Sequence, residues 1–207
     1  MKDDYKNLAK SYDDQLKDKA TRKMYLEWKN YLMKAIKQNK IKVNSLIDLG
    51  CGTGITTIPW IKKGYSVTGI EVSKPMLKEA RKKSSKVRWI NQDLVNLKIK
   101  EKFEVATCHF DVLNHILKKS DLQKAFNNIC SVLNNNGIFI FDVMSPESFN
   151  WLEKRGRNLE ISERPYSKNE LKIMIDKTDF RLLGIRKQKT PEWDGKPRRL
   201  IFLCQKI

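Results

Sequence analysis

The sequence has 207 residues, with 42 Lys and Arg against 24 Asp and Glu and a formal net charge of +18. This length favours one domain with a sizeable core, and no apolar run is long enough to cross a membrane. We expect no secretory signal, because the first residues lack an apolar segment. The four cysteines show no paired spacing, which predicts free thiols in a reducing cytoplasm.

The positive charge is spread along the chain. Of the 42 basic residues, 32 are Lys, and they occur in almost every segment. Such dispersion is more typical of a solvated surface than of a binding stripe, so nucleic acid is a partner that we do not favour. Seven of the ten Arg residues follow residue 150, and Arg binds carboxylates and phosphates through paired hydrogen bonds. An anionic acceptor near the C-terminal part is therefore an open interpretation.

Hydrophobic periodicity predicts an alternation of helices and strands. In chain order the expected elements are helices 4–18 and 20–38, strand 45–50, helix 55–64, strand 65–72, helix 73–84, strands 86–94 and 103–110, helix 120–137, strand 138–143, helix 167–179 and strands 180–189 and 198–207. Ser73 and Ser120 are predicted helix N-caps. Gly64 and Gly137 are predicted helix ends.

This alternation is typical of a doubly wound α/β sheet with helices on both faces. The last two strands follow each other without a helix, so we expect a seven-stranded mixed sheet whose last strand is antiparallel. Right-handed connections between parallel strands place ligand-binding loops at the C-terminal ends of those strands.

Three of the nine glycines, Gly50, Gly52 and Gly54, follow the first predicted strand. Glycines at this point allow a tight turn and a close approach of the backbone to a ligand. The dinucleotide pattern would require a glycine at position 55, which is Ile55, and the phosphate-binding P-loop spacing is also missing. Asp48 lies just ahead of the turn, and a carboxylate suits an ammonium group better than a pyrophosphate.

The segment "LIDLGCGTG" resembles motif I of the class I S-adenosylmethionine-dependent methyltransferases. Glu71 then ends the second strand and Asp93 follows the third, and the resemblance implies contacts with the ribose hydroxyls and the adenine amino group. The N-terminal "LAKSYDDQL" is similar to the entry segment of small-molecule members. The similarity covers most of residues 8–145 and implies a Rossmann-like fold with S-adenosylmethionine as cofactor. The residues expected to bind this cofactor are Asp48, Gly50, Cys51, Gly52, Gly54, Glu71, Val72, Met76, Asp93, Leu94 and Cys108.

The resemblance implies in-line transfer of a methyl group to an O or N atom of a small molecule, which mainly requires alignment of the reactants. His115 is the expected base or acceptor ligand, and an ordinary buried or solvated histidine is the alternative. Tyr12 is expected over the sulfonium, which an aromatic face stabilises, and core packing is its alternative. Cys108 ends a strand and is expected to be buried and inert.

The interval 144–167 is shorter than the cap that relatives of this pattern often insert there. We therefore expect a more open acceptor pocket, or one completed by a second subunit, in a monomer or homodimer. Solvated surface is the favoured reading of this stretch, and contact with an anionic acceptor is the alternative, through Trp151, Arg155, Arg157 and Arg164.

The expected division of the chain is an N-terminal helical cap (1–40), a cofactor-binding core (44–145) and an acceptor-side part (146–207). No metal is expected, because His109, Asp111 and His115 follow no ligand spacing rule. An RNA-directed methyltransferase and a cofactor-binding module without turnover are the alternative functions.

Overall fold

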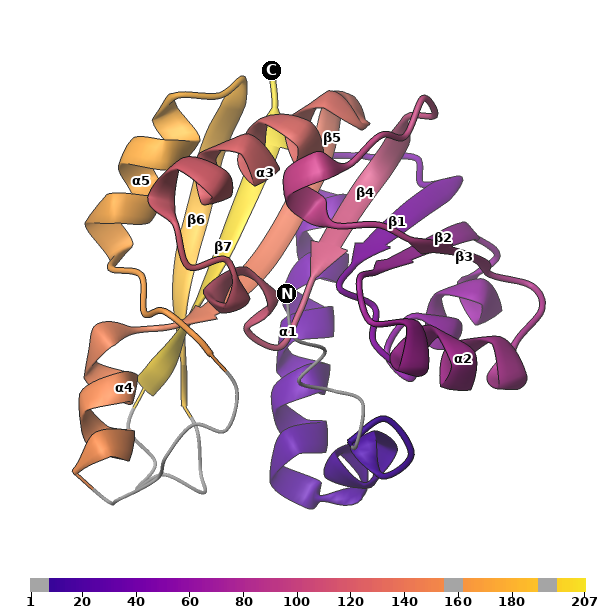
Figure 1. The fold of residues 1–207 in the computed structure, drawn as a ribbon. Helices are drawn as coiled ribbons and strands as arrows, with labels where there is room; N and C mark the ends of the chain where they lie inside the picture. The colour runs from indigo at the N-terminus through magenta and orange to yellow at the C-terminus, as the bar shows by residue number, and fades with distance from the viewer. Residues whose placement is uncertain (1–7, 155–161, 190–196) are drawn as a thin grey trace.

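The computed structural model describes residues 8–154, 162–189 and 197–207, except for the side chains of residues 15, 16, 197 and 198. Seven strands form one sheet in the order β3-β2-β1-β4-β5-β7-β6 (Figure 1). Their bounds are β1 Ser45–Leu49, β2 Ser66–Glu71, β3 Arg88–Asn91, β4 Phe103–Cys108, β5 Leu133–Met144, β6 Phe180–Lys189 and β7 Pro197–Lys206. Only β7 runs antiparallel to its neighbours, β5 and β6, which confirms the expected mixed sheet.

Helices cover both faces of the sheet. The α-helices are α1 Lys19–Gln38, α2 Lys74–Lys83, α3 Lys119–Ser131, α4 Pro146–Glu153 and α5 Lys168–Asp176. Four 3-10 helices are described: η1 Tyr12–Lys17, η2 Ile58–Lys63, η3 Leu94–Asn96 and η4 Val112–His115. In the described part of the chain, no helix is long and apolar enough to cross a membrane.

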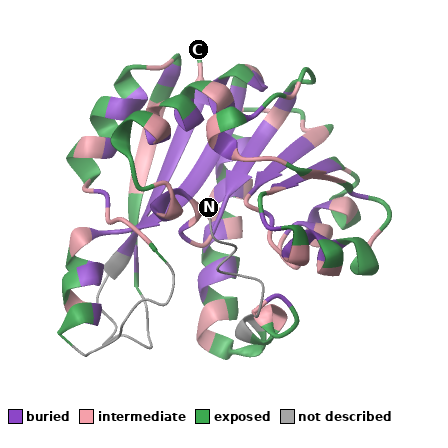
Figure 2. Cartoon of the chain, in the orientation of Figure 1, coloured by how far each residue is buried: buried purple, intermediate pink, exposed green. Residues whose placement is uncertain are grey.

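Two apolar layers hold the helices to the sheet. On one face, side chains of α3 and α5, such as Phe126 and Leu171, pack against Phe139 and Phe141 of β5. On the other face, Trp28 of α1 packs with Trp60 of η2 and with the opposite side of the strands. The central strands are therefore buried on both sides, whereas the edge strands β3 and β6 are partly exposed and the helices expose their outer faces (Figure 2). Burial on both faces explains why the strands read as continuous apolar runs.

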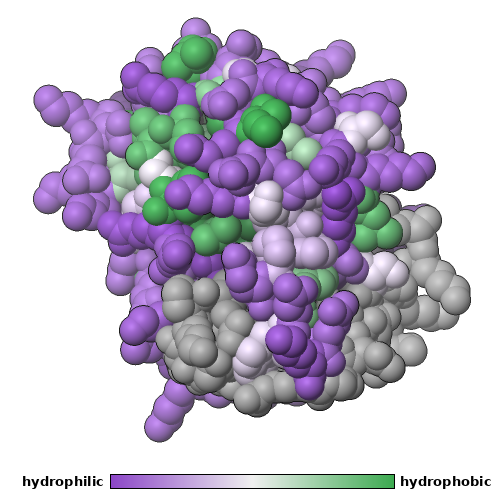
Figure 3. Space-filling view, turned by 90° about the vertical axis from the view of Figure 1, so that its left-hand side faces the viewer, coloured by the Kyte–Doolittle hydropathy of each residue, from purple (hydrophilic) through white to green (hydrophobic). Residues whose placement is uncertain are grey.

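The surface seen from the side of α5 and α4 is mainly hydrophilic, with separate small hydrophobic patches (Figure 3).

The structure corrects several predicted boundaries. Within the described residues, predicted helix 4–18 is reduced to η1, because Asp13 accepts a hydrogen bond from Thr53 (2.5 Å) and pairs with Lys83. Predicted helix 55–64 is only η2, with Pro59 in its first turn and Gly64 as the expected end at a φ of 85°. The stretch after β5, expected to be irregular, contains α4.

The largest boundary error concerns predicted helix 120–137. The helix α3 begins after Lys118, not Ser120, and ends at Ser131. Strand pairing overrides the helical pattern, because the amide of Phe103 donates to the carbonyl of Val132 and Leu133 pairs with Phe103. Gly137 therefore lies inside β5, where a Cβ atom would approach the carbonyl oxygen of Asn134 to 2.8 Å.

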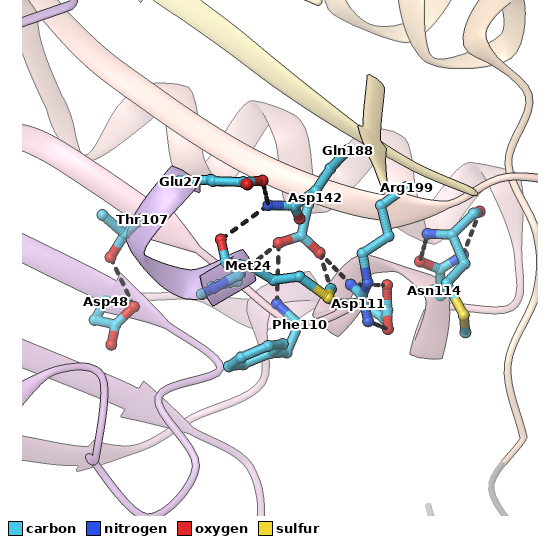
Figure 4. A network of polar contacts seen from close by, with 12 residues as sticks. Met24, Glu27, Asp48, Thr107, Phe110, Asp111, Asn114, Asp142, Gln188 and Arg199 are labelled. Carbon is cyan, nitrogen blue, oxygen red and sulfur yellow. Dashed lines mark hydrogen bonds and ion pairs between the residues drawn. The ribbon is translucent and has the colours of Figure 1, made fainter. Parts of the chain in front are cut away.

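A buried ionic network joins the ends of β4, β5 and β7 (Figure 4). Arg199 of β7 donates from both terminal nitrogens to the carboxylate of Asp111 (2.6 and 2.5 Å) and from Nη1 to Asp142 of β5 (2.8 Å). The backbone amides of Phe110 and Asp111 also donate to Asp142 (3.2 and 3.1 Å). The network thereby fixes the chain where it leaves β4.

We predict that Arg199→Met lowers the free energy of unfolding by about 3–5 kcal/mol, because two buried carboxylates lose their cation. Denaturant unfolding at neutral pH measures this loss. The exposed Arg22 of α1 provides the control, and Arg22→Met should change stability by less than about 0.5 kcal/mol. Equal effects of the two substitutions would contradict the structural role of the network.

Candidate functional site

A cavity of about 350 Å³ opens at the C-terminal ends of β1, β2, β3 and β4, a volume within the usual range for ligand pockets. Of the residues predicted to bind cofactor, those that line it are Asp48, Gly50, Cys51, Gly52, Glu71, Val72, Met76, Asp93 and Leu94. Both predicted catalytic residues, Tyr12 and His115, line it as well. Two predicted residues do not line it, Gly54 and Cys108.

Gly54 and Cys108 serve packing instead. A Cβ atom on Gly54 would lie 2.4 Å from the ring of Trp89, so this glycine makes room for the tryptophan. Cys108 is fully buried in the apolar layer beneath α3, and burial raises the pKa of its thiol well above the ordinary value. This agrees with the expectation that it is inert.

The glycine turn has the backbone that the sequence predicts. Gly50 and Gly52 have φ angles of 71° and 52°, a region that favours glycine. The amides of Gly50 and Cys51 both donate to the carbonyl of Ile70 (2.8 and 2.9 Å), which ties the turn to the end of β2. A Cβ atom on Gly50 would collide with Val112, whereas one on Gly52 would have only Tyr12 near it, at 3.8 Å. The turn is thus packed beneath Gly50 and open to the cavity at Gly52.

Three carboxylates stand on the cavity wall, each held by local donors. Glu71 accepts from the amides of Gly52 (2.9 Å) and Ser73 (2.8 Å), so it joins the glycine turn to the start of α2. Asp93 accepts from the amide of Val95 (2.9 Å) and caps η3. These bonds fix the two carboxylates at the cavity wall, where a carboxylate can accept up to four hydrogen bonds.

Asp48 is the buried member of the three. Its two oxygens accept from the hydroxyls of Thr57 (2.5 Å) and Thr107 (2.6 Å). Burial raises the pKa of Asp48 above the ordinary range, and the two threonine hydroxyls oppose that rise. A cationic group placed beside Asp48 would offset the cost of burying its charge.

The cavity wall is sharply different in charge from the rest of the molecule. The chain carries 42 Lys and Arg residues, yet among the residues that the structure describes no Lys or Arg side chain lines the cavity. Tyr12 also lines the cavity. The pKa of its hydroxyl is raised mainly by burial and, to a smaller extent, by the negative charges of Asp111 and Glu71. The tyrosine is therefore neutral at physiological pH, and the wall favours cations over phosphates.

Glu163 is a buried neighbour of His115 that the sequence did not reveal. Its Oε1 lies 3.5 Å from Nε2 of His115, and its side chain is only 10% exposed. Burial, with the nearby negative charge of Asp111, raises the pKa of Glu163 to about 7. No local motif marks this residue, which follows cavity-lining Ser162 in a poorly patterned stretch.

Long-range hydrogen bonds place Glu163 beside η4. Asn114 donates to the carbonyl of Arg164 (2.7 Å), and the amide of Arg164 donates to the carbonyl of Asn114 (2.7 Å). Tyr166 donates from its hydroxyl to the carbonyl of Ile116. The segment that begins at residue 162 is therefore held against η4, with Glu163 facing His115.

Other lining residues also went unpredicted as cofactor or catalytic residues. They are Ile55, Thr56, Ile70, Ser73, Gln92, His109, Phe110, Val112, Ile116, Leu117 and Ser162. Most of them follow a strand end, and that position was the one signal available. Within the described ranges, no group of three His, Cys, Asp or Glu side chains is arranged to hold a metal ion.

Of the residues that the sequence offered to an anionic acceptor, the two that the structure describes, Trp151 and Arg164, do not line the cavity. Arg155 and Arg157 lie outside the described residues. Arg164 donates to the carbonyl of Leu117 (3.1 Å), lies 3.7 Å from Glu170 and covers the ring of Tyr166. Trp151 packs against the small apolar cluster of α4.

Comparison with known proteins agrees with this geometry. Residues 46–137 match a family described as a methyltransferase domain. The chain is 33% identical over 155 residues to an uncharacterized protein of Methanocaldococcus jannaschii, covering 74% of this chain and 55% of that protein. The chain spans 55% to 58% of the length of the first curated relatives it matches.

Solved structures share the whole fold. An S-adenosylmethionine-dependent methyltransferase from Clostridium acetobutylicum superposes with a TM-score of 0.75 at 22% identity, over 97% of this chain and 98% of that one. The N-methyltransferase NodS from Bradyrhizobium japonicum, solved with S-adenosyl-L-homocysteine, gives a TM-score of 0.72 at 15% identity, over 93% and 90%. The domain match, the sheet order and the glycine turn agree: residues 46–137 belong to a methyltransferase domain, and the chain has the fold of S-adenosylmethionine-dependent methyltransferases.

Proposed function

We propose that this protein transfers the methyl group of S-adenosylmethionine to an O or N atom of a small-molecule acceptor. The charge of the cavity carries the proposal. Asp48, Glu71 and Asp93 line it and no described Lys or Arg does, although the chain has a net charge of +18. A wall of this kind suits a ligand with sulfonium and ammonium charges and disfavours a nucleotide phosphate.

The placement of the cofactor follows from the three carboxylates. Glu71 would hold the ribose hydroxyls and Asp93 the adenine amino group, with Val72, Met76 and Leu94 forming the apolar wall around the base. The amino-acid end would then lie beside Asp48 and the open face of Gly52. Tyr12, which lies 3.8 Å from a Cβ built on Gly52, would cover that end with its ring.

When bound, the cofactor supplies a methyl group on a good neutral leaving group. The protein then has to align the acceptor and remove its proton. We propose that His115 accepts the proton that the acceptor loses. This histidine lines the cavity and faces Glu163. A carboxylate beside the ring would stabilise the imidazolium that forms.

The curated relatives differ in the atom that they methylate. Relatives named for their activity include a malonyl-[acyl-carrier protein] O-methyltransferase and a glycine/sarcosine N-methyltransferase, which matches over 47% of this chain. Both O and N acceptors therefore remain within the proposal. We also propose that residues 1–40 cover the cofactor, 44–145 bind it and 146–207 complete the acceptor side.

Gly52→Val should abolish binding of S-adenosyl-L-homocysteine in equilibrium dialysis. The valine side chain would project toward Tyr12 into the cavity, at a φ of 52° that a branched residue rarely adopts. Gly64→Val is the matched control, since Gly64 has a φ of 85° and open space around a built Cβ outside the cavity. The control should retain binding, and equal retention by Gly52→Val would refute this placement of the cofactor.

His115→Ala should lower the rate of methyl transfer by about 10²–10⁴-fold, the usual contribution of a general base, without changing the affinity for S-adenosylmethionine. Formation of S-adenosyl-L-homocysteine with a panel of amines, phenols and carboxylic acids measures the rate. Lys118→Ala, at an exposed position in the same loop, is the control. An unchanged rate in the histidine variant would assign His115 to packing.

Glu163→Gln should remove a pH dependence of stability. The pKa of Glu163 is about 7 in the folded protein, above the ordinary value near 4.3, so the folded state holds the proton longer than the unfolded state. Its contribution to stability is therefore present at low pH and lost as the pH rises through 7. Denaturant unfolding between pH 5 and pH 8, at intervals of ~1 unit, should show a smaller decline for the variant than for the parent.

The exposed Glu153 of α4 gives the control for this experiment, and Glu153→Gln should decline as the parent does. Parallel curves for parent and Glu163→Gln would show that Glu163 ionises as an ordinary surface carboxyl group.

A further inference from the structure

His109, the residue after β4, has an almost completely enclosed ring. The ring of Phe110 stacks on it with centroids 3.9 Å apart, and the ring of Trp28 stacks at 4.5 Å, each at an interplanar angle of 11°. Two rings this close and this nearly parallel cannot share one face, so they occupy opposite faces. Only the edge of the imidazole is left for polar contacts.

One nitrogen of that edge is committed to Asp142. Nδ1 of His109 contacts Oδ2 of Asp142, which also accepts from the amide of Phe110. Oδ1 of Asp142 accepts from Arg199 and from the amide of Asp111. Although burial opposes it, the contact with His109 and the charge of Arg199 hold the pKa of Asp142 down at about 2. The carboxylate is therefore ionised and accepts from Nδ1 of His109, and in the tautomer that carries its hydrogen on Nδ1 the other ring nitrogen, Nε2, is an acceptor.

The other nitrogen is buried and has no hydrogen-bond partner among the described residues. His109 nevertheless lines the cavity. With both faces covered and Nδ1 on Asp142, the edge that carries Nε2 is the part of the ring left to face the cavity. Asp48 of β1 pairs with Thr107 of β4, two residues before His109, so Asp48 and His109 lie at neighbouring strand ends.

We propose that Nε2 of His109 accepts a hydrogen bond from the ammonium group at the amino-acid end of the cofactor. The region between Asp48 and His109 offers acceptors, because the threonine hydroxyls are already used in donating to Asp48. An occupant that satisfies Nε2 must donate a hydrogen bond, and an ammonium group does so while placing its charge beside Asp48. This inference rests on the proposed function, since it requires S-adenosylmethionine in this cavity.

Two variants isolate the Nε2 atom. His109→Phe keeps a stacked ring and removes both nitrogens, whereas His109→Asn retains an amide donor for Asp142 and lacks a counterpart of Nε2. Each substitution should lower the affinity for S-adenosylmethionine and for S-adenosyl-L-homocysteine by about 10- to 100-fold in calorimetric titration. This is the usual effect of losing a hydrogen bond to a charged group. Thermal unfolding of each variant checks that it is folded at the titration temperature.

Shortened ligands identify the group that is bound. Decarboxylated S-adenosylmethionine retains the ammonium group, so the two variants should lose affinity for it by the same factor relative to the parent. 5′-Methylthioadenosine lacks the amino-acid end and should bind parent and variants equally. The inference would be overturned if the variants lost as much affinity for 5′-methylthioadenosine as for S-adenosylmethionine. It would also be overturned if their affinity for the decarboxylated ligand equalled that of the parent.

The parent protein provides an independent measurement, because the chain has only two histidines. In protein labelled with ¹⁵N-histidine, S-adenosyl-L-homocysteine should move the Nε2 resonance of His109, and 5′-methylthioadenosine should not. His115→Gln assigns the two rings. Binding of S-adenosyl-L-homocysteine with an unmoved Nε2 resonance would overturn this inference alone, whereas failure of the parent to bind it would overturn the proposed function.

Discussion

The carboxylate of Asp142 holds the whole site together. It lies on β5, is completely buried, and accepts hydrogen bonds from Arg199 of β7, from His109 and from the amides of Phe110 and Asp111. Phe110 and Asp111 both have positive φ angles, 62° and 59°, which non-glycine residues seldom adopt. Because Asp142 receives both of their amides, it stabilises this unusual turn. The turn connects His109, which follows β4, to η4, which carries His115, and both histidines line the cavity.

The surface of the molecule and the wall of its cavity carry opposite charges. Its surface carries the large excess of Lys and Arg, while the cavity wall carries Asp48, Glu71 and Asp93. A net charge of +18 invites the idea of a nucleic-acid partner, but the described wall of the cavity offers no cation to a phosphate. Arg199, which is buried behind the turn after β4, is bound to Asp111 and Asp142. The chemistry of the cavity is therefore set by its carboxylates, and composition alone is a poor guide to it.

Local signals were sufficient to predict the cavity-lining residues at the ends of β1, β2 and β3, and insufficient for the residues around η4. The glycine turn, the strand ends at Glu71 and Asp93 and the order of the elements could be read from the sequence, because each depends on neighbouring residues. Glu163 could not, since its burial depends on contacts between Asn114 and Arg164 that lie 50 residues apart. The same limit explains the error at Gly137, where pairing of Leu133 with Phe103 ends a helix that the local pattern continued. It also explains Gly54, whose neighbour Trp89 comes from β3.

Calorimetric titration of the purified protein with S-adenosylmethionine, S-adenosyl-L-homocysteine, NAD and ATP tests the central claim most directly. A wall of carboxylates should bind the two adenosyl amino acids, with the positively charged sulfonium form at least as tight as the neutral thioether, and should give no saturable heat with either nucleotide. Saturable binding of NAD or ATP, with none of S-adenosylmethionine or S-adenosyl-L-homocysteine, would contradict it.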